Sequence, residues 1–151
     1  MNGLKNKGFT LIEVIVYLSI VSIVSMIAIP SISYFQELKL KVDARNVASD
    51  IRYTKFLTII NGTEHKIVFQ QDGYKIIDNT QKVIKSYILN KGVIFEDFEL
   101  NRGPTKVNYM CYNINGDPTA SGTLILTKTD GKKKMKLTIV PVTGRVSIID
   151  V

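Results

Sequence analysis

Cysteine, histidine and tryptophan are almost missing from this sequence. Its 151 residues include one cysteine, one histidine and no tryptophan. A single cysteine, Cys111, excludes an intrachain disulfide. The lone His65, with no cysteine or second histidine nearby, makes a poor ligand set for zinc. We therefore expect a domain without metal, cofactor or disulfide, and the sequence favours a protein that is not an enzyme.

Two other groups of residues that could carry chemistry have ordinary structural explanations. Cys111 lies in a predicted strand, Thr105 to Asn113, where a free cysteine usually packs as a small apolar residue. Glu96, Asp97 and Glu99 cluster near the end of another predicted strand, but a calcium site needs more oxygen ligands in a tight loop. We expect a buried thiol and a solvated turn.

Charge is nearly absent from the stretch Phe9 to Ile29, in which Glu13 is the single charged residue. A helix rises 1.5 Å per residue, so the stretch would span about 31 Å. The hydrocarbon core of a bilayer is about 30 Å thick. A cleaved secretory signal is the alternative, but its apolar core is only about 7–15 residues long and ends in small residues, which Ala28-Ile29-Pro30 supplies poorly. The stretch therefore predicts a transmembrane segment over residues 9–30.

The start of this apolar stretch suggests an orientation and a candidate site. Lys5 and Lys7 precede it, and the positive-inside rule places them in the cytoplasm and the chain beyond Pro30 outside. Glu13 is a candidate functional residue because a carboxylate is costly inside a bilayer. Alternatively, Glu13 simply reaches the interface, since it lies only four residues inside the stretch.

The segment Lys7-Gly8-Phe9-Thr10-Leu11-Ile12-Glu13 resembles the cleavage and methylation signature of type IV pilins and pseudopilins. A short basic leader ends in glycine, phenylalanine follows the cut, glutamate stands at the fifth position after it, and about twenty apolar residues follow. The resemblance implies that a prepilin peptidase removes the leader, residues 1–8, by cutting between Gly8 and Phe9. It also implies N-methylation of the new amino terminus of Phe9.

The same resemblance implies a role for Glu13 in fibre assembly, through pairing with the terminal amine of a neighbouring subunit. Opposite charges attract strongly in a low-dielectric bundle, and neither is stable there without a partner. Pro30 stands where the family often has a helix-kinking proline. Since proline removes a backbone donor and clashes with the preceding turn, it predicts a kink.

Beyond the apolar stretch, the sequence predicts a continuing helix and then a β-rich head. Apolar residues at spacings of three and four predict an amphipathic helix over residues 31–61, ended by Asn61-Gly62, with charged residues mostly off the apolar stripe. Alternation and turn residues predict strands within residues 62–151. The predicted fold class is α+β, a long amino-terminal helix packed on an antiparallel β-sheet or β-sandwich head. The stripe consists of Leu40, Ala44, Val47, Ala48 and Ile51, and the strands are 65–70, 74–78, 81–89, 93–98, 105–113, 122–128, 133–140 and 145–149.

Short motifs in the second half are similar to those of H-type pseudopilins of type II secretion and of related minor type IV pilins. The resemblance implies a structural subunit, a minor pilin or pseudopilin of a type IV pilus, a type II secretion system or a competence pseudopilus. It implies a single-pass protein of the cytoplasmic membrane that enters a fibre, with other pilin subunits, prepilin peptidase, an inner-membrane assembly platform and membrane lipid as partners. The motifs are Ser49-Asp50-Ile51-Arg52, Asn115-Gly116, Gly122-Thr123-Leu124-Ile125-Leu126 and Thr143-Gly144-Arg145-Val146.

DNA is the alternative partner, because the chain has a formal charge of +7 and one strongly basic stretch. Lysines there could follow a phosphate backbone, or they could keep the exposed face of an amphipathic strand soluble. In some members implicated in DNA uptake, a Gly-Arg pair near the carboxyl end is followed two residues later by a second arginine. Here Gly144-Arg145 is followed by Ser147, so that motif is incomplete. The candidate DNA contacts are Lys132, Lys133, Lys134, Lys136 and Arg145.

Overall fold

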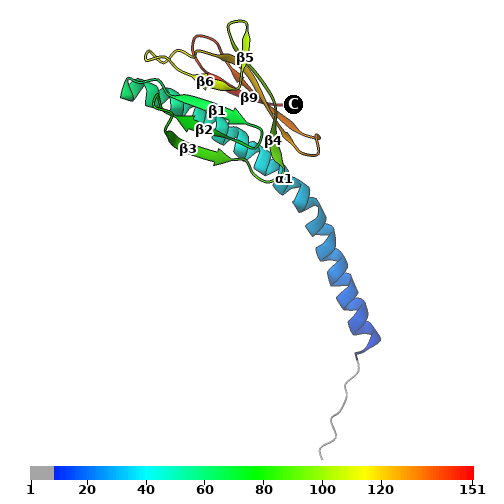
Figure 1. Ribbon diagram of the computed structural model, residues 1–151. Coiled ribbons are helices and arrows are strands. Elements are labelled where there is room, and N and C mark those ends of the chain that lie inside the picture. Colours follow the sequence, from blue (N-terminus) through cyan, green and yellow to red (C-terminus); the bar gives the residue numbers. More distant parts are fainter. Residues whose placement is uncertain (1–8) are drawn as a thin grey trace, which may run out of the picture. The chain divides into compact units, whose positions relative to one another are not determined.

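The computed structural model describes residues 9–151, except for the side chains of residues 27–33 (Figure 1). The predicted leader, residues 1–8, lies outside the described residues. A long helix is followed by nine strands, which confirms the predicted α+β class. The elements are α1 (Leu11–Asn61), β1 (Lys66–Gln70), β2 (Gly73–Ile77), β3 (Val83–Ile88), β4 (Val93–Arg102), β5 (Thr105–Val107), β6 (Tyr109–Cys111), β7 (Ser121–Lys128), β8 (Lys134–Ile139) and β9 (Val146–Asp150).

The chain divides into two compact units, Met1–Gln36 and Glu37–Val151. Helix α1 begins in the first unit and ends in the second, which contains all the strands. From here on, the head means this second unit, Glu37–Val151, which includes the second part of α1 as well as the strands. Pro30, where a kink is predicted, lies among residues 27–33, outside the residues whose side chains are described, and the kink stays a prediction.

Two antiparallel sheets pack with the second part of α1 in the head. The four-stranded sheet has the order β3-β2-β1-β6, and the five-stranded sheet has the order β5-β4-β7-β8-β9. Alternation along β8 places Met135, Leu137 and Ile139 in the core and leaves Lys136 exposed, as the amphipathic pattern predicted.

The predicted apolar stripe of the helix is buried in the head. Leu40, Ala44, Val47, Ala48 and Ile51 are all at most 2% exposed. They pack with the inward residues of both sheets, including a group of aromatic rings on β1, β2 and β4, which are Phe69, Tyr74, Phe95 and Phe98. The helix ends at Asn61, and the following Gly62 has φ +61°, a left-handed conformation that glycine adopts without a steric penalty.

Two sequence-based expectations about the head are wrong. The predicted strand Thr105 to Asn113 is two strands, because β5 pairs with β4 while β6 pairs with β1 in the other sheet. Asn108 lies at the crossing, where its carbonyl accepts a 2.8 Å hydrogen bond from Phe69 N. The acidic residues Glu96, Asp97 and Glu99 lie within the long strand β4, beside a bulge, rather than in a turn.

Candidate functional site

Helix α1 starts with a reciprocal capping box between Thr10 and Glu13. The amide of Thr10 donates to Oε2 of Glu13 at 3.3 Å, and the amide of Glu13 donates to Oγ1 of Thr10 at 3.3 Å. The Thr10 hydroxyl also lies 3.4 Å from the same carboxylate oxygen. The positive end of the helix dipole favours a negative charge at this position. Within one chain, the carboxylate of Glu13 therefore caps the amino terminus of its own helix.

The capping box is a feature that sequence reasoning missed. The signal was present, since Thr-x-x-Glu before an apolar run is a typical helix start. The predicted cleavage site is only partly within the described residues. Phe9 is 76% exposed just ahead of the helix, whereas Gly8 lies outside. The roles predicted for Gly8, Phe9 and Glu13 stay predictions.

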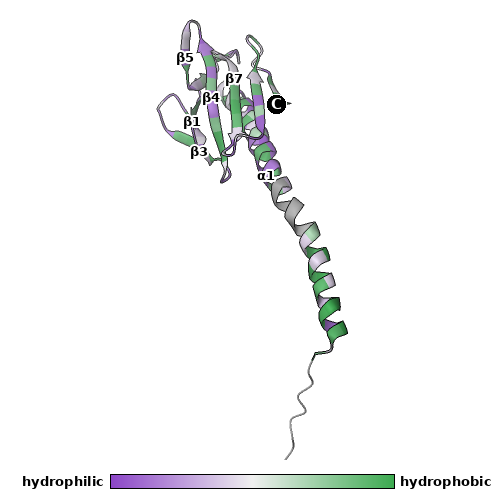
Figure 2. Cartoon of the chain, turned by 90° about the vertical axis from the view of Figure 1, so that its right-hand side faces the viewer, coloured by the Kyte–Doolittle hydropathy of each residue, from purple (hydrophilic) through white to green (hydrophobic). Residues whose placement is uncertain are grey.

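The described residues in the first part of α1, Leu11 to Met26, are mostly apolar (Figure 2). From Leu11 to Met26 all side chains are exposed. The hydroxyls of Ser19, Ser22 and Ser25 donate to backbone carbonyls four residues earlier at 2.7–2.8 Å, so they need no outside partner. Within the residues that the structure describes, no helix reaches the length and apolarity needed to cross a membrane. The transmembrane segment predicted over residues 9–30 stays a prediction.

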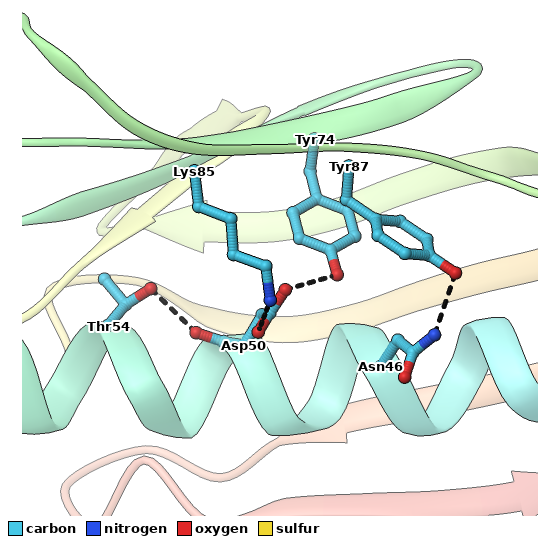
Figure 3. Close-up of polar contacts among 6 residues, drawn as sticks. All are labelled: Asn46, Asp50, Thr54, Tyr74, Lys85 and Tyr87. Atoms are coloured by element: carbon cyan, nitrogen blue, oxygen red, sulfur yellow. Dashed lines mark hydrogen bonds and ion pairs between the residues drawn. The ribbon is translucent and has the colours of Figure 1, made fainter.

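In the head, the carboxylate of Asp50 joins α1 to the four-stranded sheet (Figure 3). Asp50 is 5% exposed. Its Oδ2 accepts a 2.7 Å hydrogen bond from the hydroxyl of Tyr74 on β2, and its Oδ1 lies 2.7 Å from Nζ of Lys85 on β3. Thr54 donates to the Asp50 carbonyl at 2.8 Å. One helical residue thus binds two neighbouring strands.

Asp43, two helical turns before Asp50, makes a second attachment to the same sheet. It is fully buried and accepts hydrogen bonds from the Tyr87 hydroxyl at 2.8 Å, from Asn90 N at 2.9 Å and from Asn90 Nδ2 at 2.7 Å. Asn46 donates to the Tyr87 oxygen at 2.8 Å. These hydrogen bonds satisfy a carboxylate that would otherwise be costly to bury.

The two tyrosines of these attachments resist ionisation. Burial, followed by the hydrogen bond to Asp50, raises the pKa of Tyr74 far above its usual value. Burial and the hydrogen bond to Asp43 raise the pKa of Tyr87 as well. A phenolate beside a carboxylate would be repelled, so both hydroxyls stay protonated donors.

The five candidate DNA contacts do not lie together. Lys132 and Lys133 are exposed in the turn between β7 and β8, and Lys134 pairs with Glu96 at 2.7 Å. Lys136 lies further along β8. Arg145 lies at the opposite end of β8, where its carbonyl accepts a hydrogen bond from Val140 N. Arg145 and the lysines of the turn are therefore separated by the length of β8, which rises about 3.3 Å per residue.

Arg145 has cationic neighbours that sequence reasoning did not identify. Nη2 of Arg52 on α1 donates to the carbonyl of Val146 at 3.3 Å, and Nζ of Lys55 donates to the carbonyl of Thr143 at 3.0 Å. None of these three cations forms an ion pair with a described residue. No periodicity in the sequence could show that α1 and β9 lie side by side here.

The remaining residues that could carry chemistry, Cys111 and His65, make hydrogen-bonding contacts with nearby groups. Cys111 is 1% exposed, as predicted, and its Sγ lies 2.7 Å from the Thr119 hydroxyl. Burial raises the pKa of the Cys111 thiol, which disfavours the reactive thiolate. The ring of buried His65 contacts the Thr63 carbonyl at 2.8 Å. Among the described residues, no three His, Cys, Asp or Glu side chains gather as a metal site would require.

Comparison with known proteins agrees with the signature at the amino terminus and with the fold. Residues 3–29 match the prokaryotic N-terminal methylation motif. No curated protein sequence matches the chain. A solved structure that resembles the chain is the minor pseudopilin EpsH from the Type 2 Secretion System of Vibrio cholerae, with a TM-score of 0.58 and 11% identity over 74% of this chain and 97% of that one. The motif and the fold together confirm the resemblance to the pilin and pseudopilin superfamily.

Proposed function

We propose that this chain is a minor pilin or pseudopilin, a structural subunit that a prepilin peptidase processes and that joins a fibre through its amino-terminal helix. The observation that carries the proposal is the methylation motif over residues 3–29 on a chain with the fold of a minor pseudopilin. The fibre would belong to a type IV pilus, a type II secretion system or a competence apparatus. The role is structural rather than catalytic.

The first part of α1 would hold the unassembled subunit in the cytoplasmic membrane, with the head outside. Its described residues expose apolar side chains on every side, and its three serine hydroxyls are satisfied by the helix itself. Both properties suit a lipid environment, where an unpaired polar group is costly. Lys5 and Lys7 would stay in the cytoplasm until the leader is removed.

Glu13 would change partners when the subunit enters the fibre. In the single chain it caps α1 together with Thr10. Beside a neighbouring subunit it would pair with the methylated amine of that subunit's Phe9. Opposite charges attract strongly in a low-dielectric bundle of helices, so this pairing would favour assembly once the new amino terminus exists.

The proposal is tested by following the protein into the complex of prepilins in cells that express them together with the peptidase and the platform protein. The protein should co-purify and crosslink with the other prepilins only when the peptidase is active. A matched sample with an inactive peptidase is the control. Equal association with and without processing would contradict the proposal.

DNA capture by the head is a second candidate function, favoured by the three cations around Thr143 to Val146. Arg145 is part of this segment, and Arg52 and Lys55 of α1 donate hydrogen bonds to its backbone carbonyls. Binding to phosphates would weaken steeply with salt. The full chain in detergent should bind duplex DNA more weakly at high salt, and Arg145→Ala should reduce affinity further. No binding at low salt would contradict this candidate.

A further inference from the structure

Four strands lie at the ends of the two sheets, and three of them are protected against pairing with another chain. An edge strand presents unpaired backbone N–H and C=O groups, and proteins usually keep such edges short, cover them or charge them. Strands β5 and β6 have only three residues each. The edge of β9 lies along α1, where Arg52 donates to Val146 and Lys55 donates to Thr143 just before the strand.

The remaining edge, that of β3, is neither short nor covered by another described element, and the bulge in its pairing with β2 lies near its start, between Val83 and Lys85. It is six residues long, Val83 to Ile88, and pairs only with β2 among the described strands (Figure 1). Val83, Ile84 and Ile88 are 49%, 40% and 77% exposed. Lys85 is the single lysine of the strand. Its charge does not protect the edge against pairing, because its Nζ lies 2.7 Å from the buried carboxylate of Asp50.

Strand β3 is also held in place by contacts on the side that faces α1. Lys85 and Tyr87 point toward α1, where Lys85 binds Asp50 (Figure 3). Tyr87 donates a hydrogen bond to Asp43 on the same helix. A chain that added to this edge would find its hydrogen-bonding groups already ordered. Less conformational entropy would then be lost on binding.

We propose that the free edge of β3 binds an extended segment of another protein, which adds to the four-stranded sheet as a fifth strand. Backbone hydrogen bonds would supply affinity, and alternating side chains would supply specificity. The inference goes beyond the proposed function and does not depend on it, because it concerns only the head.

The two exposed lysines that flank β3 favour one kind of segment. Exposed Lys82 directly precedes the strand, exposed Lys91 follows it by three residues, and neither has an ion-pair partner among the described residues. The complementary segment is apolar in its centre and acidic at both ends. A second copy of this chain fits poorly. Parallel pairing of two β3 strands would place Lys82 beside Lys82, antiparallel pairing would bring Lys82 near Lys91, and like charges across strands are destabilising.

The test uses synthetic peptides as probes and the full chain in detergent micelles. One peptide alternates valine and threonine between glutamates, a second has lysines in place of the glutamates, and a third is the acidic peptide with a central proline. Amide hydrogen exchange in residues 83–88 should slow by about tenfold or more with the acidic peptide. It should slow less with the lysine peptide and stay unchanged with the proline peptide.

Two matched substitutions show whether the edge of β3 is responsible. Ile88→Glu places a charge on the free strand that repels the acidic peptide and should abolish the protection, whereas Ile149→Glu on the covered strand β9 should leave it intact. Both side chains are exposed, so circular dichroism should show an unchanged fold. The proposal is overturned if the acidic peptide at about millimolar concentration protects no amide of β3, if the proline peptide protects equally, or if sedimentation shows a dimer whose β3 amides are already protected without any peptide.

Discussion

Tyr74 on β2 donates a 2.7 Å hydrogen bond to the buried carboxylate of Asp50 on α1. Lys85 on the neighbouring strand β3 contacts the other oxygen of that carboxylate at the same distance. A sheet and a helix usually meet through apolar side chains alone, but here a charged group lies between them. The arrangement fixes the register of the helix against the sheet, because only one helical position brings the three groups together.

Replacing Asp50 should destabilise the head. Asp50→Ala leaves the ammonium of Lys85 and the hydroxyl of Tyr74 without their acceptor, and we expect a loss of about 2–3 kcal/mol in the free energy of unfolding. Urea unfolding of the full chain in detergent, followed by tyrosine fluorescence, measures the loss. Asp150→Ala is the control, because the pair of Asp150 with Lys41 is half exposed and 3.8 Å long, and its loss should cost less than about 1 kcal/mol. Equal losses in the two variants would contradict this prediction.

Stability should fall in strong alkali, and Tyr74 and Tyr87 should contribute to this fall. Folding raises the pKa of both hydroxyls above the unfolded value of about 10, so their contribution is complete below that pH. As the pH rises above about 10, the unfolded state loses protons that the folded state keeps, and unfolding becomes more favourable. Urea titrations between neutral pH and pH 11 should show this decline, and Tyr74→Phe should make it shallower. A slope unchanged in Tyr74→Phe would show that other groups cause the decline.

Gly122 should be the glycine least able to accept a side chain. Its φ is +143°, and a methyl group there would overlap the carbonyl oxygen of Glu99 on the paired strand β4. Gly122→Ala should therefore disrupt the pairing of β4 with β7 and cost roughly 3 kcal/mol or more. Gly131→Ala is the matched control, since Gly131 also has positive φ but has open space around it, and it should cost about 1 kcal/mol. Thermal unfolding of the two variants compares these losses.

The sequence predicted what depends on local periodicity and missed what depends on contacts between distant elements. The helical stripe from Leu40 to Ile51 and the buried face of β8 follow directly from spacing. The division at Asn108 could not be predicted, because a continuous period-two pattern does not show which strand each half pairs with. Burial of Asp43 and Asp50 was missed for a related reason. The carboxylates of Asp43 and Asp50 accept hydrogen bonds from Tyr74, Lys85 and Tyr87, which lie 24–44 residues further along the sequence.

Processing should occur between Gly8 and Phe9. The prediction rests on the motif over residues 3–29 and on the exposed position of Phe9 ahead of α1. Mass spectrometry of protein from cells with an active prepilin peptidase should identify N-methyl-phenylalanine as the first residue. Gly8→Leu should leave the precursor uncut. Protein that keeps Met1 in the presence of an active peptidase would refute the assignment.

Assembly should depend on the charge of Glu13 and not on its capping of α1. Because Glu13 both caps the helix in one chain and is proposed to pair with a neighbour's amine, Glu13→Ala removes both functions and cannot separate them. Glutamine can still complete a capping box but carries no charge. Glu13→Gln should therefore keep the helix start and lose the ion pair. Thr10→Ala removes the threonine side of the box and leaves the charge in place.

If charge pairing drives assembly, Glu13→Ala and Glu13→Gln should accumulate in the membrane, be processed at Gly8, and fail to join the other prepilins. An unpaired buried charge on the neighbour's amine would cost roughly 3–5 kcal/mol. Thr10→Ala should still assemble, and Glu13→Asp should be intermediate because its shorter side chain keeps the charge but reaches less far. Crosslinking to the other prepilins at equal membrane abundance gives the comparison. Normal incorporation of Glu13→Gln alongside failure of Thr10→Ala would mean that Glu13 acts through the helix cap. Normal incorporation of every variant would mean that it only lies at the membrane interface.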